Sequence, residues 1–186
     1  RRQRQMCIRD SPEGVRLWEI SGLVRGSRVY LTTPGLRLRV GRSPVTVRGE
    51  VLLSANGYLD LEVETAGLDA ALVRRLFFPG AVPIRGPLQG RLRLTGAPQT
   101  LRISGRIRSP EVVVAHQPLR SLTTQLTFEA GTLALTGLEA QTAGGGVRGD
   151  LLLDPGGSVY LFAGDVWRVP TTALEQVLGL ALPLLS

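Results

Sequence analysis

The chain has 186 residues, of which 43% are hydrophobic and only 5% aromatic, and it contains 23 glycines and 12 prolines. Its 22 basic residues, all arginine, outnumber the 15 acidic ones and give a formal net charge of +7. The hydrophobic content is too high for a disordered basic tail. One Cys and one His exclude a disulfide framework and leave almost nothing for a Cys/His metal site. Composition therefore favours a folded chain that binds something, with no cofactor, over an enzyme.

Alternation of apolar and polar residues dominates the chain. It recurs at Leu36–Val40, Tyr58–Glu64, Arg91–Leu94, Leu101–Arg108 and Leu122–Phe128. A period of two places the apolar side chains on one face of a strand and the polar ones on the other, as in a half-buried antiparallel sheet. The pattern predicts a mostly β chain with many short strands.

Turn signals separate the expected strands. Asn56–Gly57, Ala130–Gly131 and Asp154–Gly157 combine glycine with residues that tolerate the backbone of a tight turn. The strands on either side of each turn are therefore expected to be antiparallel neighbours.

Two segments have helical spacing instead. Leu68, Ala71, Leu72 and Leu76 predict a short amphipathic helix over 68–78 that ends before a proline. Near the end of the chain, Thr172 and Glu175 form a capping-box pattern ahead of an apolar stripe, which predicts a second helix over 172–182.

The chain also repeats itself. Ile20–Arg25 resembles Ile103–Arg108, and Val47–Leu53 resembles Val147–Leu153, with the same order and a helix after each second motif. We therefore expect a lead-in over 1–19, a first β unit over 20–82, and a second over 83–186 that is truncated before a further unit. Repeats of this kind stack along one direction and bury a continuous face.

Several of these glycine-punctuated strands carry a resemblance to a known family. They are Pro83–Gly86 with Leu88–Gly96, then Leu101–Ile107, then Leu133–Ala140 leading into Gly144–Gly149. Their sequence and order resemble the TamB (translocation and assembly module) family, within the AsmA-like, repeating β-groove proteins. The likeness covers most of 20–182.

This resemblance implies an elongated, curved antiparallel sheet that forms an open, gutter-shaped β-groove with short amphipathic helices. It also implies a bacterial cell-envelope location, in a periplasm-spanning protein anchored in the inner membrane by a segment outside this chain. The family is implicated in outer-membrane biogenesis, by conducting phospholipid or by assisting outer-membrane protein assembly. The implied partners are phospholipid acyl chains or unfolded β-strand cargo, and an outer-membrane barrel reached through other regions.

A groove is also expected on physical grounds, because a curved sheet with one apolar face must cover that face with a sheet, a helix or a ligand. Leu, Val and Ile dominate the apolar positions, which suits acyl chains. The residues expected to line the groove are Leu59, Leu61, Val63, Leu92, Leu94, Leu101, Ile103, Ile107, Leu126, Phe128, Leu133 and Leu135.

The alternative is a structural β-sandwich or adhesion-type repeat that binds a protein partner through its strand edges. The two hypotheses differ in whether the aliphatic faces line an open trough or close against each other. Lipid and polypeptide cargo are not separated by the sequence.

Polar candidates give weaker signals. The arginines at 91, 93, 102, 106 and 108 favour a solvated face over a nucleic-acid site, because no aromatic residues lie between them for base stacking. His116 is expected in a strand or loop, and Cys7 has nothing nearby that would make it reactive. No Gly-x-Ser-x-Gly elbow occurs, and one His leaves little room for a catalytic triad.

Overall fold

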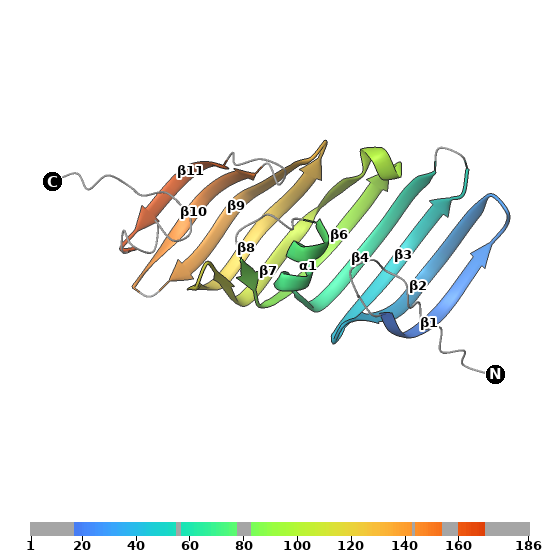
Figure 1. Ribbon diagram of the computed structural model, residues 1–186, viewed down its shortest axis with the longest axis horizontal. Helices are drawn as coiled ribbons and strands as arrows, with labels where there is room; N and C mark the ends of the chain where they lie inside the picture. Colours follow the sequence, from blue (N-terminus) through green and yellow to red (C-terminus); the bar gives the residue numbers. More distant parts are fainter. Residues whose placement is uncertain (1–16, 55–56, 78–82, 143, 154–159, 170–186) are drawn as a thin grey trace.

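A computed structural model describes residues 17–54, 57–77, 83–142, 144–153 and 160–169. Within these ranges the chain forms one antiparallel sheet of eleven strands and a single short α-helix (Figure 1). The mostly β fold predicted from the alternating pattern is confirmed.

The strands follow one another across the sheet almost in chain order. Ten of them run β1-β2-β3-β4-β6-β7-β8-β9-β10-β11, and the short β5 pairs with an extension of β7. The elements are β1 Leu17–Gly26, β2 Tyr30–Val40, β3 Ser43–Leu52, β4 Tyr58–Asp69, α1 Ala70–Phe77, β5 Ile84–Arg85, β6 Pro87–Gly96, the 3-10 helix η1 Pro98–Thr100, β7 Arg102–Val114, β8 Gln117–Glu129, β9 Thr132–Thr142, β10 Gly145–Leu153 and β11 Tyr160–Trp167.

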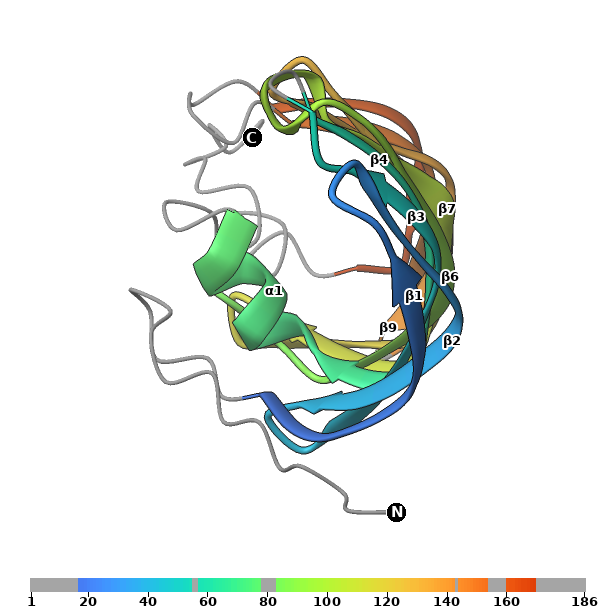
Figure 2. The ribbon, with the colours of Figure 1, turned by 90° about the vertical axis from the view of Figure 1, so that its right-hand side faces the viewer.

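The sheet is elongated and curved but does not close. Viewed along its length it has a C-shaped cross-section, with α1 on the inside of the curve (Figure 2). Among the described strands, β1 pairs only with β2 and β11 only with β10, so the two ends of the sheet remain apart. The expected open β-groove is therefore the observed architecture.

Glycines within the strands permit the tight curvature. Gly49 of β3 and Gly105 of β7 have φ values of +124° and +154°, which side-chain-bearing residues rarely adopt. A Cβ at Gly49 would collide with the carbonyl oxygen of Asp60, and one at Gly105 with that of Arg91. The neighbouring backbones approach closely because these positions lack side chains.

Shifts of register bend the strands further. Irregular pairing occurs in β2 between Thr33 and Leu36, and in β4 between Thr65 and Leu68. An extra residue in one strand of a pair increases local twist and bends that strand. Thr65 hydroxyl donates to the carbonyl of Pro44 at 3.2 Å, so this buried side chain is hydrogen-bonded where the ladder is disrupted.

Helix α1 begins two residues later than the apolar spacing predicts. Leu68 and Asp69 still pair with Leu88 and Pro87 as part of β4, so the sheet retains them. Asp69 then caps the helix, because its Oδ1 accepts from the backbone N–H of Ala71 at 2.9 Å. Ala70 N–H donates to the carbonyl of Gly86 at 2.8 Å and fixes the start of the helix to the chain before β6.

Some predicted features are confirmed and others fall outside the described ranges. The Ala130–Gly131 turn joins β8 to β9, with positive φ at both residues. The second helix over 172–182, the turn at 154–157 and residue 56 of the Asn56–Gly57 turn lie outside the described residues. The 3-10 helix Pro98–Thr100 was not predicted; its proline stands at the first turn, where no backbone donor is needed.

The core lies at one long margin of the sheet. Ala70, Val112, Leu122 and Ala140 form a buried cluster, and Val112 is completely buried. Half-buried apolar side chains pack around it, namely Ile84, Leu88, Val114, Leu119, Leu138 and Val147. α1 therefore packs on the same face of the sheet as Leu88 and Val147. Because α1 lies inside the curve of the sheet, this face is the concave one.

The two pairs of repeated motifs differ in the relative direction of their strands. Val47–Leu53 and Val147–Leu153 belong to β3 and β10, which run in the same direction and are each followed by the next strand of the sheet. Ile20–Arg25 and Ile103–Arg108 belong to β1 and β7, which run in opposite directions. Division into units at 20–82 and 83–186 stays a prediction, since the sheet itself is continuous.

Candidate ligand groove

A row of directly opposed residues crosses the whole concave face. In an antiparallel sheet, opposed residues share a face, so register alone places them together. The row comprises Gly22, Leu36, Val47, Val63, Leu92, Gly105, Leu126, Leu135, Leu151 and Phe162, one from each strand of the main path. No polar side chain interrupts it. We call it the central row.

A second apolar row lies beside the central row. Its members are Leu61, Leu94, Ile103, Phe128, Leu133 and Leu153. The two rows alternate along each strand, so together they make an aliphatic band on the inner face.

Eleven of the twelve residues expected to line the groove lie on this face, in strands. Leu59 opposes Val51 and Gly96, and Ile107 opposes Gly90 and Thr124. The other nine belong to the two rows. Leu101 lies between η1 and β7, outside the ladder. Their proposed role in binding a ligand stays a prediction.

The aliphatic band is not sealed into a core. Leu133 is buried at 7% exposure, but the other predicted lining residues are half-buried. Among the described residues, Val112 is the largest side chain with less than 2% exposure. No second sheet packs on the concave face within the described ranges, so a two-sheet sandwich is not the observed architecture.

The opposite, convex face is charged. Acidic side chains of β4 lie between arginines of β3 and β6: Arg91 Nε lies 3.3 Å from Glu62 Oε1, and Arg93 makes two bonds to Asp60 at 3.0 and 2.9 Å. The hydrogen bonds from Arg93, and then its positive charge, lower the pKa of the Asp60 carboxyl, although partial desolvation opposes this. The expectation of a solvated, charged face agrees with these exposed ion pairs.

The outer members of the central row were not among the predicted site residues. Leu36, Val47, Leu151 and Phe162 extend the row to both ends of the sheet. Leu36 belongs to the alternating segment Leu36–Val40, so the alternation could have predicted its face of the strand. The alignment of all four with Leu92 depends on register, which the alternation does not fix.

The lone His lies outside the aliphatic band. His116 lies in the β7–β8 turn, exposed and with φ +74°. Cys7 lies outside the described residues. Within the described part of the chain, no three His, Cys, Asp or Glu side chains group closely enough to hold a metal ion, and none of its helices has the length and apolarity needed to cross a bilayer.

Hollows also lie outside the open concave face in the described part of the chain, among them two with charged lining residues. One, of about 490 Å³, lies on the convex face beside Arg48, Asp60 and Arg93. The other, of about 540 Å³, lies at the margin of the sheet between the start of β3 and the β5–β7 pair. Its lining includes Arg42, Asp69, Arg85 and Glu111.

Comparisons with known proteins add no relative: no protein-family model, no curated protein and no solved structure matches the chain.

Proposed function

We propose that the concave face binds phospholipid acyl chains, and that the chain is a segment of a TamB-like, AsmA-like periplasm-spanning protein of the bacterial cell envelope. The observation that supports this most directly is the central row. Ten strands contribute to it without a polar side chain, while its large members remain half-buried.

The dimensions of the band suit such a ligand. Strands about 4.8 Å apart give a ten-strand row roughly 43 Å long. The hydrocarbon of one bilayer leaflet is about 15 Å thick, half of the usual core. The row that runs across the strands is therefore long enough to hold an extended acyl chain.

The chemistry of the band also suits acyl chains. The rows contain Leu, Val, Ile and Gly with few aromatics, so they offer apolar contact without fixed stacking geometry. Each fully buried methylene contributes about 0.8 kcal/mol, and an open trough that covers half of the chain contributes about half of that. Moderate affinity with free movement along the row is the expected result.

A second candidate is an extended polypeptide, as in assistance with outer-membrane protein assembly or adhesion-type partner binding. The observation that favours it is that β1 and β11 each have a single neighbouring strand within the described part of the chain. An exposed edge presents backbone donors and acceptors to an incoming strand. Such cargo would bind at the ends of the sheet through the main chain.

In-cell photo-crosslinking separates the two candidates. A benzophenone amino acid replaces Leu94 on the concave face in one variant, and the neighbouring Arg93 on the convex face in a control. We expect the residue at 94, but not at 93, to capture phospholipid. Protein adducts at 94 without lipid would show a polypeptide on the band in place of acyl chains, and no adduct above the control would reject acyl-chain binding there. The polypeptide candidate itself predicts protein adducts at the edge strands β1 and β11.

A matched pair of substitutions tests the band in vitro. Leu126 and Thr127 are successive half-buried residues of β8 on opposite faces. Leu126→Gln places an amide against the acyl chain and is expected to lower lipid retained by the purified chain roughly tenfold. Thr127→Gln is expected to leave it unchanged; equal retention by the two variants would contradict the proposal.

A further inference from the structure

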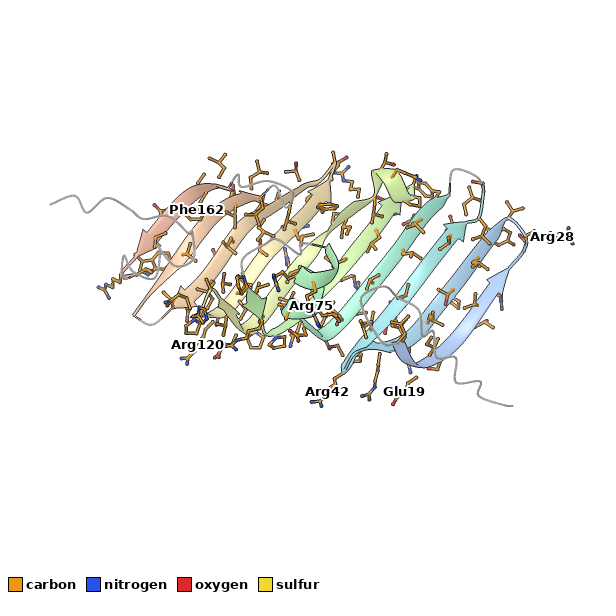
Figure 3. All side chains as sticks on the ribbon, viewed as in Figure 1. Glu19, Arg28, Arg42, Arg75, Arg120 and Phe162 are labelled. Carbon is orange, nitrogen blue, oxygen red and sulfur yellow. The ribbon has the colours of Figure 1, made fainter. Side chains whose placement is uncertain are left out.

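The 540 Å³ hollow at the sheet margin has charges of both signs. We call it the rim notch and define it by Arg42, Asp69, Arg85 and Glu111, which all line it. Arg42 belongs to the β2–β3 turn and Asp69 to the end of β4, while Arg85 and Glu111 come from β5 and β7. Segments distant in sequence therefore meet there. Figure 3 shows Arg42 and Arg120, the ion-pair partner of Glu111, projecting from the same long margin.

The two arginines are available for a ligand. Both side chains are exposed, and neither guanidinium forms an ion pair or side-chain hydrogen bond with another residue of the described ranges. A guanidinium binds phosphate oxygens in a bidentate manner and stays charged at any relevant pH. Arg42 and Arg85 line the same hollow from different segments, which suits a phosphate group bound in it.

The two carboxylates are each satisfied on one oxygen only. Asp69 Oδ1 accepts from Ala71 N–H at 2.9 Å, and Glu111 Oε2 lies 3.4 Å from Arg120 Nε. Within the described part of the chain, Asp69 Oδ2 and Glu111 Oε1 have no partner. The four lining side chains carry two positive and two negative charges, with Arg120 paired to Glu111 beside them. Groups of both signs are complementary to a zwitterion.

The walls of the notch are held in place by buried hydroxyls. Ser43 Oγ donates to the Gly67 carbonyl at 2.7 Å on one side, and Ser109 Oγ donates to the Pro87 carbonyl at 2.6 Å on the other. Ser43 and Ser109 are 7% and 2% exposed. Little rearrangement is needed before binding, which lowers its entropic cost.

The notch also adjoins the concave face. Asp69 lines the notch, and the next residue, Ala70, is 1% exposed in the cluster beneath α1. A lipid that occupied both the aliphatic band and the notch would cross the margin beside the start of α1.

We infer that the rim notch binds the phosphoethanolamine headgroup of a phospholipid. Arg42 and Arg85 hold the phosphate, and Asp69 and Glu111 accept hydrogen bonds from the primary ammonium. This inference rests on the proposed function, because it assigns the headgroup of the lipid whose acyl chains occupy the band. A choline headgroup has no N–H to donate, and a glycerol headgroup has no positive charge, so both fit less well.

The test is a competition for the purified 186-residue chain. Vesicles contain equal amounts of phosphatidylethanolamine, phosphatidylcholine, phosphatidylglycerol and diacylglycerol, all dioleoyl, and mass spectrometry quantifies the lipid retained. We expect enrichment of phosphatidylethanolamine over the other three. The variant Arg42→Gln/Arg85→Gln is expected to lower the ratio of phosphatidylethanolamine to diacylglycerol by roughly 3- to 10-fold, the range for two exposed charged hydrogen bonds.

A control removes the same charge elsewhere. Arg37 and Arg106 are exposed on the convex face, so Arg37→Gln/Arg106→Gln changes net charge equally and should leave the ratio unchanged. Glu111→Gln removes a negative charge in place of a positive one. It should shift retention from phosphatidylethanolamine toward the anionic phosphatidylglycerol. All these substitutions are at exposed positions, and unfolding curves confirm that each variant is folded.

The outcomes are distinguishable. If the natural chain retains no lipid of any class, the proposed function fails, and the headgroup inference with it. If lipids are retained but their ratios do not respond to Arg42→Gln/Arg85→Gln, the headgroup inference alone is overturned. A further measurement uses soluble glycerophosphoethanolamine as the ligand. If it binds as tightly as the lipid does, the notch is a site for the free headgroup and not for a phospholipid.

Discussion

Leu92 of β6 and Gly105 of β7 oppose each other on the concave face, and the absence of a side chain at Gly105 lets the two backbones approach. Gly105 has φ +154°, and its missing Cβ leaves room for the carbonyl oxygen of Arg91. This close approach lies in the middle of the central row. It connects the curvature of the sheet to the surface proposed to bind acyl chains.

Gly105→Ala should therefore destabilise the fold. Alanine at this φ is strained and its Cβ collides with backbone, for an expected loss of about 1–3 kcal/mol in the free energy of unfolding. Urea unfolding followed by circular dichroism measures it. Gly35→Ala is the control, because nothing lies within 4 Å of a Cβ built there. An equal loss in both variants would show that the close approach at Gly105 is not important.

Val112→Ala tests the core beneath α1. Val112 is 0% exposed, so removing two methyl groups should cost about 2 kcal/mol from lost transfer energy and a residual cavity. The next residue, Val113, is half-buried and lines the rim notch, and Val113→Ala should cost less than about 1 kcal/mol. If the two variants have the same denaturant midpoint, the placement of the core is wrong.

Asp69→Ala removes the cap of α1. The loss of the bond to Ala71 N–H should lower stability by about 1 kcal/mol and increase amide hydrogen exchange at the start of the helix. Asp69→Asn keeps a side-chain oxygen acceptor and should retain most of that stability. If the asparagine variant loses as much as the alanine variant, the role of Asp69 is electrostatic and not that of a cap.

Arg93→Gln should raise the pKa of Asp60 toward the ordinary range. Arg93 lowers this pKa chiefly through its hydrogen bonds, so the folded chain holds the proton less tightly than the unfolded chain does. The contribution of the Arg93–Asp60 pair to the free energy of unfolding is fully present above the ordinary aspartate pKa of about 3.9. It is lost as the pH falls through the lower pKa of the folded chain.

Carboxyl-carbon NMR titration measures the change at Asp60. Arg148→Gln is the control, because Arg148 pairs with Glu139 on distant strands and should not alter the titration of Asp60. An unchanged pKa in Arg93→Gln would show that the ion pair does not persist in solution.

The faces of individual strands were predictable from local sequence. Leu59, Leu61 and Val63 alternate with acidic residues, and strand geometry alone places them on one side. The start of α1 was not predictable from spacing, because Leu68 fits both a helical stripe and a strand. Its pairing with Leu88, 20 residues later in the chain, decides the matter.

Alternation within single strands does not predict how far the groove extends across the sheet. Phe162 on β11 joins Leu36 on β2 in one row only because eight intervening registers, including several shifted ones, bring them into line. Leu101 has the right residue type but stands after the 3-10 helix Pro98–Thr100, where the chain is not part of a strand. The rim notch combines four distant segments and leaves no continuous motif.

The alternation of apolar and polar residues along this apolar, arginine-rich chain determined that it folds as strands with one aliphatic and one charged face. Backbone geometry enforces that result locally, because side chains alternate in any strand. The tertiary structure alone decided that the sheet stays open, that its aliphatic positions align into a band, and that Arg42, Asp69, Arg85 and Glu111 meet at its margin. These features depend on register and curvature, which arise from contacts between residues far apart in the chain.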